Sequence, residues 1–132
     1  MSRLCPCTSG LVIDKCCAPY LKGQRLPETA QALMRSRFTA YAESRVDYLI
    51  QTTAEAKRQE IDPEELRRYC INIRCISLKV LKTELGGKND ETGTVLFHAS
   101  LQMNKRRVLH RELSEFIKED GKWMYVSGET NE

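Results

Sequence analysis

The chain has 132 residues, 41% of them hydrophobic and 30% charged, and its 21 Lys and Arg against 18 Asp and Glu give a formal net charge of +3. This profile is typical of one soluble domain and argues against two full domains. The chain has no apolar run of about 18 residues, and its N-terminus lacks the basic-then-apolar order of a signal peptide. We therefore expect a cytoplasmic protein that does not enter a membrane.

Four of the six cysteines gather near the N-terminus, as Cys5-Pro6-Cys7 and Cys16-Cys17. In a reducing compartment such a cluster is more typical of a metal site than of disulfides, and adjacent cysteines pair with difficulty. Four thiolates complete the tetrahedral shell of one zinc ion and leave no position for water or substrate. We expect one structural zinc ion, bound by Cys5, Cys7, Cys16 and Cys17.

The residues between the two cysteine pairs indicate a turn followed by a short apolar run. We expect Gly10 to adopt a positive φ in this turn. The apolar residues beyond it either form a contact patch for a protein partner or pack on the main domain: Leu11, Val12, Ile13 and Tyr20. Because so short a segment has almost no core of its own, we expect it to be energetically separable from the rest of the chain.

Three helices are predicted in the next part of the chain. Apolar side chains recur with a period of 3.6 over residues 28–45, and a short apolar stretch over residues 46–53 continues the pattern after a break. Asp62 is suited to cap a third helix and Pro63 to occupy its first turn. This third helix should end near Asn72.

Beyond residue 72 the hydrophobic period changes from 3.6 toward 2, which predicts strands. Turn residues at 86–90, 104–105 and 120–121 divide this region into four strands. Helices followed by a strand meander are typical of an α+β fold with the helices on one face of an antiparallel sheet.

The cysteine pattern and three other regions resemble known families. Cys5-Pro6-Cys7-Thr8-Ser9-Gly10 followed by Cys16-Cys17 resembles the SEC-C motif, a zinc knuckle, with Thr8 where glycine is usual. Residues 19–21, 27–41 and 116–126 resemble the YchJ-like family of uncharacterised bacterial proteins. The resemblance implies a zinc knuckle over residues 1–24 and a nuclear transport factor 2-like cone, with helices on a curved antiparallel sheet, over residues 25–132. It implies no established activity.

The chain departs from the family pattern at two positions that bear on catalysis. Arg111 stands where the family usually has the histidine of His-Glu, and Ala54 stands where a histidine often follows Thr52-Thr53. Those histidines are therefore not essential in this chain.

The candidate ligand-binding residues of the cone are Arg37, Tyr41, Glu112, Trp123 and Tyr125. Arg37 shares the inward stripe of its helix with Tyr41, so it either pairs with Glu112 or Glu115 or is left to bind a carboxylate or phosphate ligand. Trp123 and Tyr125 share one face of the last strand, where they either line a cavity or cap the core.

Two histidines and two cysteines complete the candidates. His98 and His110 lie on predicted strands, either as general bases or as half-exposed strand residues. Cys70 and Cys75 lack the spacing of a redox motif, and we expect both to be core thiols.

These patterns favour a zinc-binding adaptor or binding module, with no catalytic residue assigned. The alternative is a small enzyme that acts on an anionic ligand in the cone. A protein partner at the knuckle or a small-molecule ligand in the cone fits this chain better than nucleic acid or a ribosome, since its basic residues are scattered.

Overall fold

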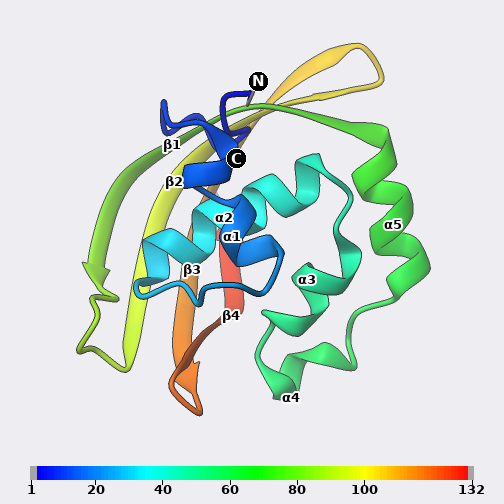
Figure 1. The fold of residues 1–132 in the computed structure, drawn as a ribbon. Helices are drawn as coiled ribbons and strands as arrows, with labels where there is room; N and C mark the ends of the chain where they lie inside the picture. Colours follow the sequence, from blue (N-terminus) through cyan, green and yellow to red (C-terminus); the bar gives the residue numbers. More distant parts are fainter. Residues whose placement is uncertain (1–2, 131–132) are drawn as a thin grey trace.

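The computed structural model describes residues 3–130, in which short helices come first and one sheet follows (Figure 1). The helical part comprises η1 (Ile13–Lys15), α1 (Ala18–Leu21), α2 (Ala30–Ala42), α3 (Val46–Gln51), α4 (Glu55–Arg58) and α5 (Pro63–Asn72). The sheet comprises β1 (Ile73–Leu85), β2 (Thr92–Met103), β3 (Arg106–Glu119) and β4 (Lys122–Thr130). None of the helices within residues 3–130 is long and apolar enough to span a membrane.

The helix boundaries follow from local capping. Thr29 caps α2 by accepting a hydrogen bond from the Ala32 amide, and Asp62 caps α5 by accepting from two amides of its first turn. The prediction that α5 begins at Pro63 and ends at Asn72 is confirmed. The helix predicted over 28–45 is shorter, because the chain turns through Ser44 with a φ of 55° after Ala42.

The four strands form one antiparallel meander in the order β1-β2-β3-β4, as the sequence predicts. Asn104 and Lys105 join β2 to β3 with φ values of 50° and 67°, and Asp120 and Gly121 join β3 to β4 with 52° and 78°. Two successive positive φ angles are the signature of the tight hairpin turn that matches strand twist. The predicted α+β fold is confirmed.

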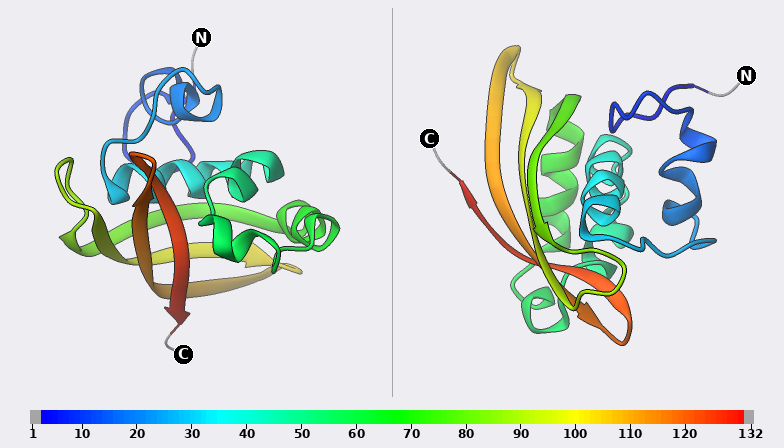
Figure 2. Two further views of the ribbon diagram at one scale, coloured as in Figure 1. Left: turned by 90° about the horizontal axis from the view of Figure 1, so that it is seen from below. Right: turned by 90° about the vertical axis from the view of Figure 1, so that its left-hand side faces the viewer.

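The sheet curves around α2, and the N-terminal segment (residues 3–24) lies on the other side of that helix (Figure 2). The inward side chains of β2 are Val95, Phe97, Ala99 and Leu101, all of them buried. They pack against Leu33 and Phe38 of α2 in the main core. The molecule therefore has α2 as its middle layer, with the sheet on one side and the N-terminal segment on the other.

The N-terminal segment shares the core of the domain. Cys5, Cys7 and Ile13 belong to the same buried cluster as Leu33 and Phe38. Ile13 is only 8% exposed, so the run of three exposed apolar residues does not form, although Leu11 stays exposed. The shared core argues against the energetic separability that the sequence suggests.

Candidate functional site

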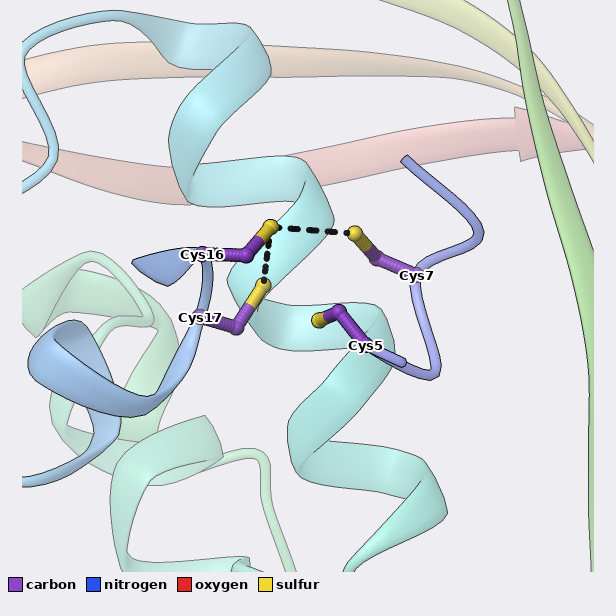
Figure 3. A group of neighbouring side chains, drawn as sticks. All are labelled: Cys5, Cys7, Cys16 and Cys17. Carbon is purple, nitrogen blue, oxygen red and sulfur yellow. Dashed lines mark hydrogen bonds between the residues drawn. The ribbon is translucent and has the colours of Figure 1, made fainter. Parts of the chain in front are cut away.

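The four N-terminal cysteines converge on one point, with their side chains directed toward one another (Figure 3). All four sulfur atoms lie within 4.8 Å of one another. The Sγ atoms of Cys7 and Cys16 are 3.5 Å apart, and those of Cys16 and Cys17 are 3.9 Å apart. All four cysteines are free, with three of them buried and Cys16 partly exposed.

These separations match the shell of a tetrahedral metal ion. Four sulfurs at about 2.3 Å from a zinc ion would lie about 3.8 Å from one another. The ligand set is all-thiolate, which suits a soft or borderline metal and fills every position of the shell. The four residues can therefore hold a metal ion in a closed site.

Without a bound metal ion, the clustered thiols strongly shift the pKa values of Cys7, Cys16 and Cys17. Hydrogen bonds from Cys17 and Cys5 lower the pKa of Cys7, whereas burial raises the pKa of Cys16 to about 11. Hydrogen bonds to Cys5 and Cys7, together with burial, raise the pKa of Cys17. In this arrangement Cys7 is a thiolate that accepts hydrogen bonds from the neighbouring thiols. A divalent cation would replace the protons of these hydrogen bonds and bind the sulfur atoms directly.

The cysteine cluster is anchored to α2 and to the edge of the sheet. The Thr39 hydroxyl lies 3.5 Å from the Cys5 sulfur, and Arg35 donates to the Cys7 carbonyl at 3.2 Å. The Thr8 hydroxyl shares its proton between the Cys7 carbonyl at 2.7 Å and the Leu78 carbonyl at 3.0 Å, and it accepts from the Leu78 amide at 3.0 Å. Contacts from α2 and from β1 thus fix the cluster in place.

A second feature is a cavity of about 240 Å³ between α2, α5 and the concave face of the sheet. Its wall is largely apolar and includes Met34, Phe38, Phe97 and Leu101. Arg37 and Tyr41 enter from α2, His110 and Glu112 from β3, and Tyr125 from β4. The cavity therefore combines an apolar wall with a small set of converging polar groups.

Arg37 is fixed by neutral groups. Its Nη1 atom donates to the Leu49 carbonyl at 2.9 Å, to Thr52 Oγ1 at 2.7 Å and to Thr53 Oγ1 at 3.4 Å. The guanidinium carbon lies 4.5 Å from the centre of the Tyr125 ring, in cation–π geometry. The expectation that Arg37 is buried is confirmed, at 5% exposure.

Glu112 accepts hydrogen bonds from three side chains. His110 Nε2 lies 2.9 Å from Oε1, while Ser114 Oγ and, at 3.2 Å, the Tyr125 hydroxyl donate to Oε2. Burial raises the pKa of Glu112, but these hydrogen bonds outweigh it and the pKa is lowered. The hydrogen bond with Glu112 raises the pKa of His110. The pair is therefore stabilised as an imidazolium and a carboxylate.

The structure brings together four of the five predicted cone residues: Arg37, Tyr41, Glu112 and Tyr125. Trp123 shares their side of the sheet but is buried in the core, where its indole N–H donates to the Glu28 carbonyl at 3.1 Å. No ion pair of Arg37 with Glu112 or Glu115 is found among residues 3–130, and Glu115 is exposed.

The remaining candidates divide between the two faces of the sheet. His110 lies in the cavity, whereas His98 sits between Phe97 and Ala99 on the opposite face of β2. Cys70 is a core thiol as predicted, but Cys75 is partly exposed and lines the cavity. Sequence reasoning missed Tyr69, whose ring meets Tyr41 edge-on in the same cavity.

Comparison with known proteins places this arrangement in a family. The family model described as "YchJ, middle NTF2-like domain" matches residues 29–128. A UPF0225 protein of Geobacter sulfurreducens is 37% identical over 97% of this chain and 80% of its own length. A UPF0225 protein of Actinobacillus succinogenes is 34% identical over 96% of this chain and 81% of its own.

Two solved structures share the fold. The solution structure of a SEC-C motif containing protein from Rhodopseudomonas palustris has a TM-score of 0.88 at 33% identity and covers 97% of this chain and 98% of its own. The crystal structure of a SEC-C motif containing protein from Psychrobacter arcticus has a TM-score of 0.82 at 22% identity, covers 97% and 82%, and shows the fold alone. With a family model over residues 29–128 and relatives above 30% identity along nearly its whole length, the chain belongs to the YchJ-like, UPF0225 family of uncharacterised proteins.

Proposed function

We propose that this protein is a binding module for a small molecule, in which a structural zinc ion holds the N-terminal segment against the helix that covers the ligand cavity. The observation that carries the proposal is that α2 contacts both the cysteine cluster and the cavity. Arg35 and Thr39 of this helix contact the cysteine cluster, whereas Arg37 and Tyr41 line the cavity. One helix thus links the metal site to the ligand site.

Zinc is the metal that best fits the cysteine cluster. Four thiolates at these separations suit its size and its tetrahedral preference, and zinc itself has no redox chemistry. A shell filled by four thiolates leaves no position for a substrate, so the role of the ion is structural. Its binding energy then contributes directly to folding.

The cavity is the better ligand site. The N-terminal segment has few exposed apolar side chains, Leu4 and Leu11 among them, because Ile13 is buried in the core. The cavity, in contrast, combines an apolar wall with oriented polar groups, which is the usual composition of a small-molecule site. At about 240 Å³ it suits a ligand smaller than a typical drug molecule.

Titration with benzyl alcohol, followed by amide NMR spectra, tests the binding module. Signals of cavity residues such as Phe97 should shift in the zinc-loaded protein. Ala99→Leu, which narrows the cavity, should abolish these shifts, whereas Ser100→Leu on the opposite face of the same strand should leave them intact. Equal responses in the two variants, or no response in the wild type, would refute the proposed site.

A second candidate function is acid–base catalysis in the same cavity. The contact that favours it is the His110–Glu112 pair, because a carboxylate that orients an imidazole is a common element of general-base sites. Under this proposal His110→Gln abolishes turnover of the ligand bound in the cavity and leaves the affinity for that ligand nearly unchanged. Loss of both together would assign His110 to binding.

A further inference from the structure

We infer that the cavity binds a small monocarboxylate, with the carboxylate on Arg37 and Tyr41 and the apolar body against Met34, Phe38 and Phe97. This inference rests on the proposed binding function and adds the class of the ligand. It follows from the balance of donors and acceptors around the cavity.

Arg37 offers hydrogen-bond donors that its protein partners do not use. Within residues 3–130, the acceptors Leu49, Thr52 and Thr53 are all bound by its Nη1 atom. Nε and Nη2 carry three further N–H groups, of which the Tyr41 hydroxyl accepts one at most, so at least two remain available in a side chain that is 5% exposed and lines the cavity. A guanidinium edge of this kind matches the two oxygens of a carboxylate.

Tyr41 adds a hydroxyl next to Arg37. Burial raises the pKa of this hydroxyl, and the charge and hydrogen bond of Arg37 partly offset the effect. A buried neutral phenol keeps its proton, so Tyr41 can donate to an oxygen of the ligand while accepting from Arg37. The two side chains, one helical turn apart on α2, form a single donor site.

Glu112 does not compete as a recognition group. Its two oxygens already accept from His110, Ser114 and Tyr125, which occupy three of about four lone-pair sites and leave little acceptor capacity for an ammonium group of a ligand. Tyr125 joins the two charged centres, because its ring face stacks on Arg37 while its hydroxyl donates to Glu112. The cavity therefore selects against amines and amino acids.

The charge of the site also limits the ligand. Arg37 supplies one positive charge, Glu112 one negative charge, and His110 adds a second positive charge when it is protonated. With His110 protonated these charges sum to +1, which neutralises one carboxylate but not a phosphate dianion in a mostly apolar cavity. The apolar side chains of the wall then accommodate a hydrocarbon or aromatic body.

Calorimetric titration with benzoate, benzyl alcohol and benzylamine tests the inference on the zinc-loaded protein. The three probes share a ring and differ in the polar group. Benzoate should bind at least tenfold more tightly than benzyl alcohol, and benzylamine should not bind. Tyr41→Phe should weaken benzoate about tenfold, the usual effect of one hydrogen bond to a charged group, and leave benzyl alcohol unchanged.

Tyr69→Phe is the matched control, because it removes a second hydroxyl from the same cavity and should retain the affinity for benzoate. Arg37→Met should lose benzoate binding and keep benzyl alcohol; if it does not fold, Tyr41→Phe still decides.

Equal affinities for benzoate and benzyl alcohol, or tighter binding of benzylamine, would overturn the carboxylate while leaving the binding module intact. A second, separate pocket is lined by Arg25, Arg58 and Lys122, and benzoate that shifts amide signals there instead of in the cavity would also overturn the inference. Binding of none of the three probes would refute both proposals.

Discussion

Thr8 is held in a backbone conformation that glycine adopts freely. Its φ is 60°, in the turn directly after Cys7, and this region favours glycine because it lacks a Cβ atom. The hydroxyl of Thr8 compensates by bonding both backbone groups of Leu78. Thr8 therefore lacks the conformational freedom that glycine would have at this position, but its hydroxyl forms a hydrogen-bonded bridge from the cysteine cluster to the edge strand β1.

Removal of the Thr8 hydroxyl separates the two effects. Thr8→Ala loses the bridge and keeps the unfavourable φ, so it should lower the free energy of unfolding by about 1–2 kcal/mol. Thr8→Gly also loses the bridge but relieves the backbone, and should recover about 1 kcal/mol of that loss. Urea unfolding of the wild type, Thr8→Ala and Thr8→Gly measures the order of their free energies of unfolding. Thr8→Ala as stable as wild type would contradict a stabilising bridge.

The His110–Glu112 pair predicts a defined pH dependence of stability. The pKa of His110 is raised above 6.5, so its contribution is complete below that pH and is lost as pH rises through the folded-state pKa. The pKa of Glu112 is lowered below 4.5, so its contribution is complete above that pH and is lost as pH falls. The pair therefore stabilises the fold most between about pH 4.5 and 6.5.

A double-mutant cycle with His110→Gln and Glu112→Gln measures this coupling. At pH 5.5 we expect about 1 kcal/mol, a modest value because His110 is partly exposed, and clearly less at pH 8.5. A coupling energy that grows between these two pH values would contradict the assigned charges.

At the scale of single residues, the sequence was sufficient to predict those features that depend on local chemistry. The spacing of the cysteines identified the cluster, and the period of α2 placed Arg37 inside the domain. The partners of Arg37 were not predictable, because Thr52 and Thr53 lie beyond the end of α3, where the backbone pairs with Tyr125 of the distant strand β4. Long-range pairing of this kind leaves no mark on the hydrophobic pattern.

At the scale of the elements, the hairpin between β1 and β2 is locked against the start of α2. The Ala30 amide donates to the Gly86 carbonyl at 2.9 Å. A Cβ atom at Gly93 would lie 2.4 Å from the Gly86 Cα, a backbone atom that cannot move without shifting the hairpin. The hydrogen bond from Ala30 thus joins the hairpin to the helical layer, and the close approach of Gly93 to Gly86 fixes the shape of the hairpin itself.

Gly93→Ala should therefore destabilise the protein by about 2 kcal/mol or more. Gly87→Ala, in the same loop, meets only the flexible end of Asp90 at 3.2 Å and should cost less than about 1 kcal/mol. Thermal unfolding of both variants checks the difference. Similar midpoints would mean that the hairpin adjusts freely.

Helices and strands were predictable from the sequence where capping and periodicity agree, as in α5 and the four-stranded meander. The short helices α1 and α4 were not, because two turns or fewer give no recognisable period. The cavity was also unpredictable in detail, since its lining residues come from α2, α5 and all four strands, which lie far apart in the sequence.

For the whole molecule, the cysteine cluster and the domain share one core. Cys5, Cys7 and Ile13 pack with Leu33 and Phe38, so loss of the proposed metal ion should loosen the main domain as well as the N-terminal segment. We expect chelation to lower the single unfolding midpoint of the chain by about 10 °C or more.

Scanning calorimetry with and without chelator measures this shift. Cys75→Ala, which leaves the four candidate ligands intact, should show the same response as wild type. A main transition that keeps its midpoint after complete metal removal would show that the segment is energetically separate.

X-ray absorption at the zinc edge, on the protein as purified, tests the four-cysteine metal site most directly. We predict one zinc ion per chain with four sulfur neighbours at about 2.3 Å. Cys16→Ser should lose the ion or replace one sulfur by a lighter atom. A wild-type protein with well under one zinc per chain, or with nitrogen or oxygen in the zinc shell, would contradict a closed structural site on Cys5, Cys7, Cys16 and Cys17.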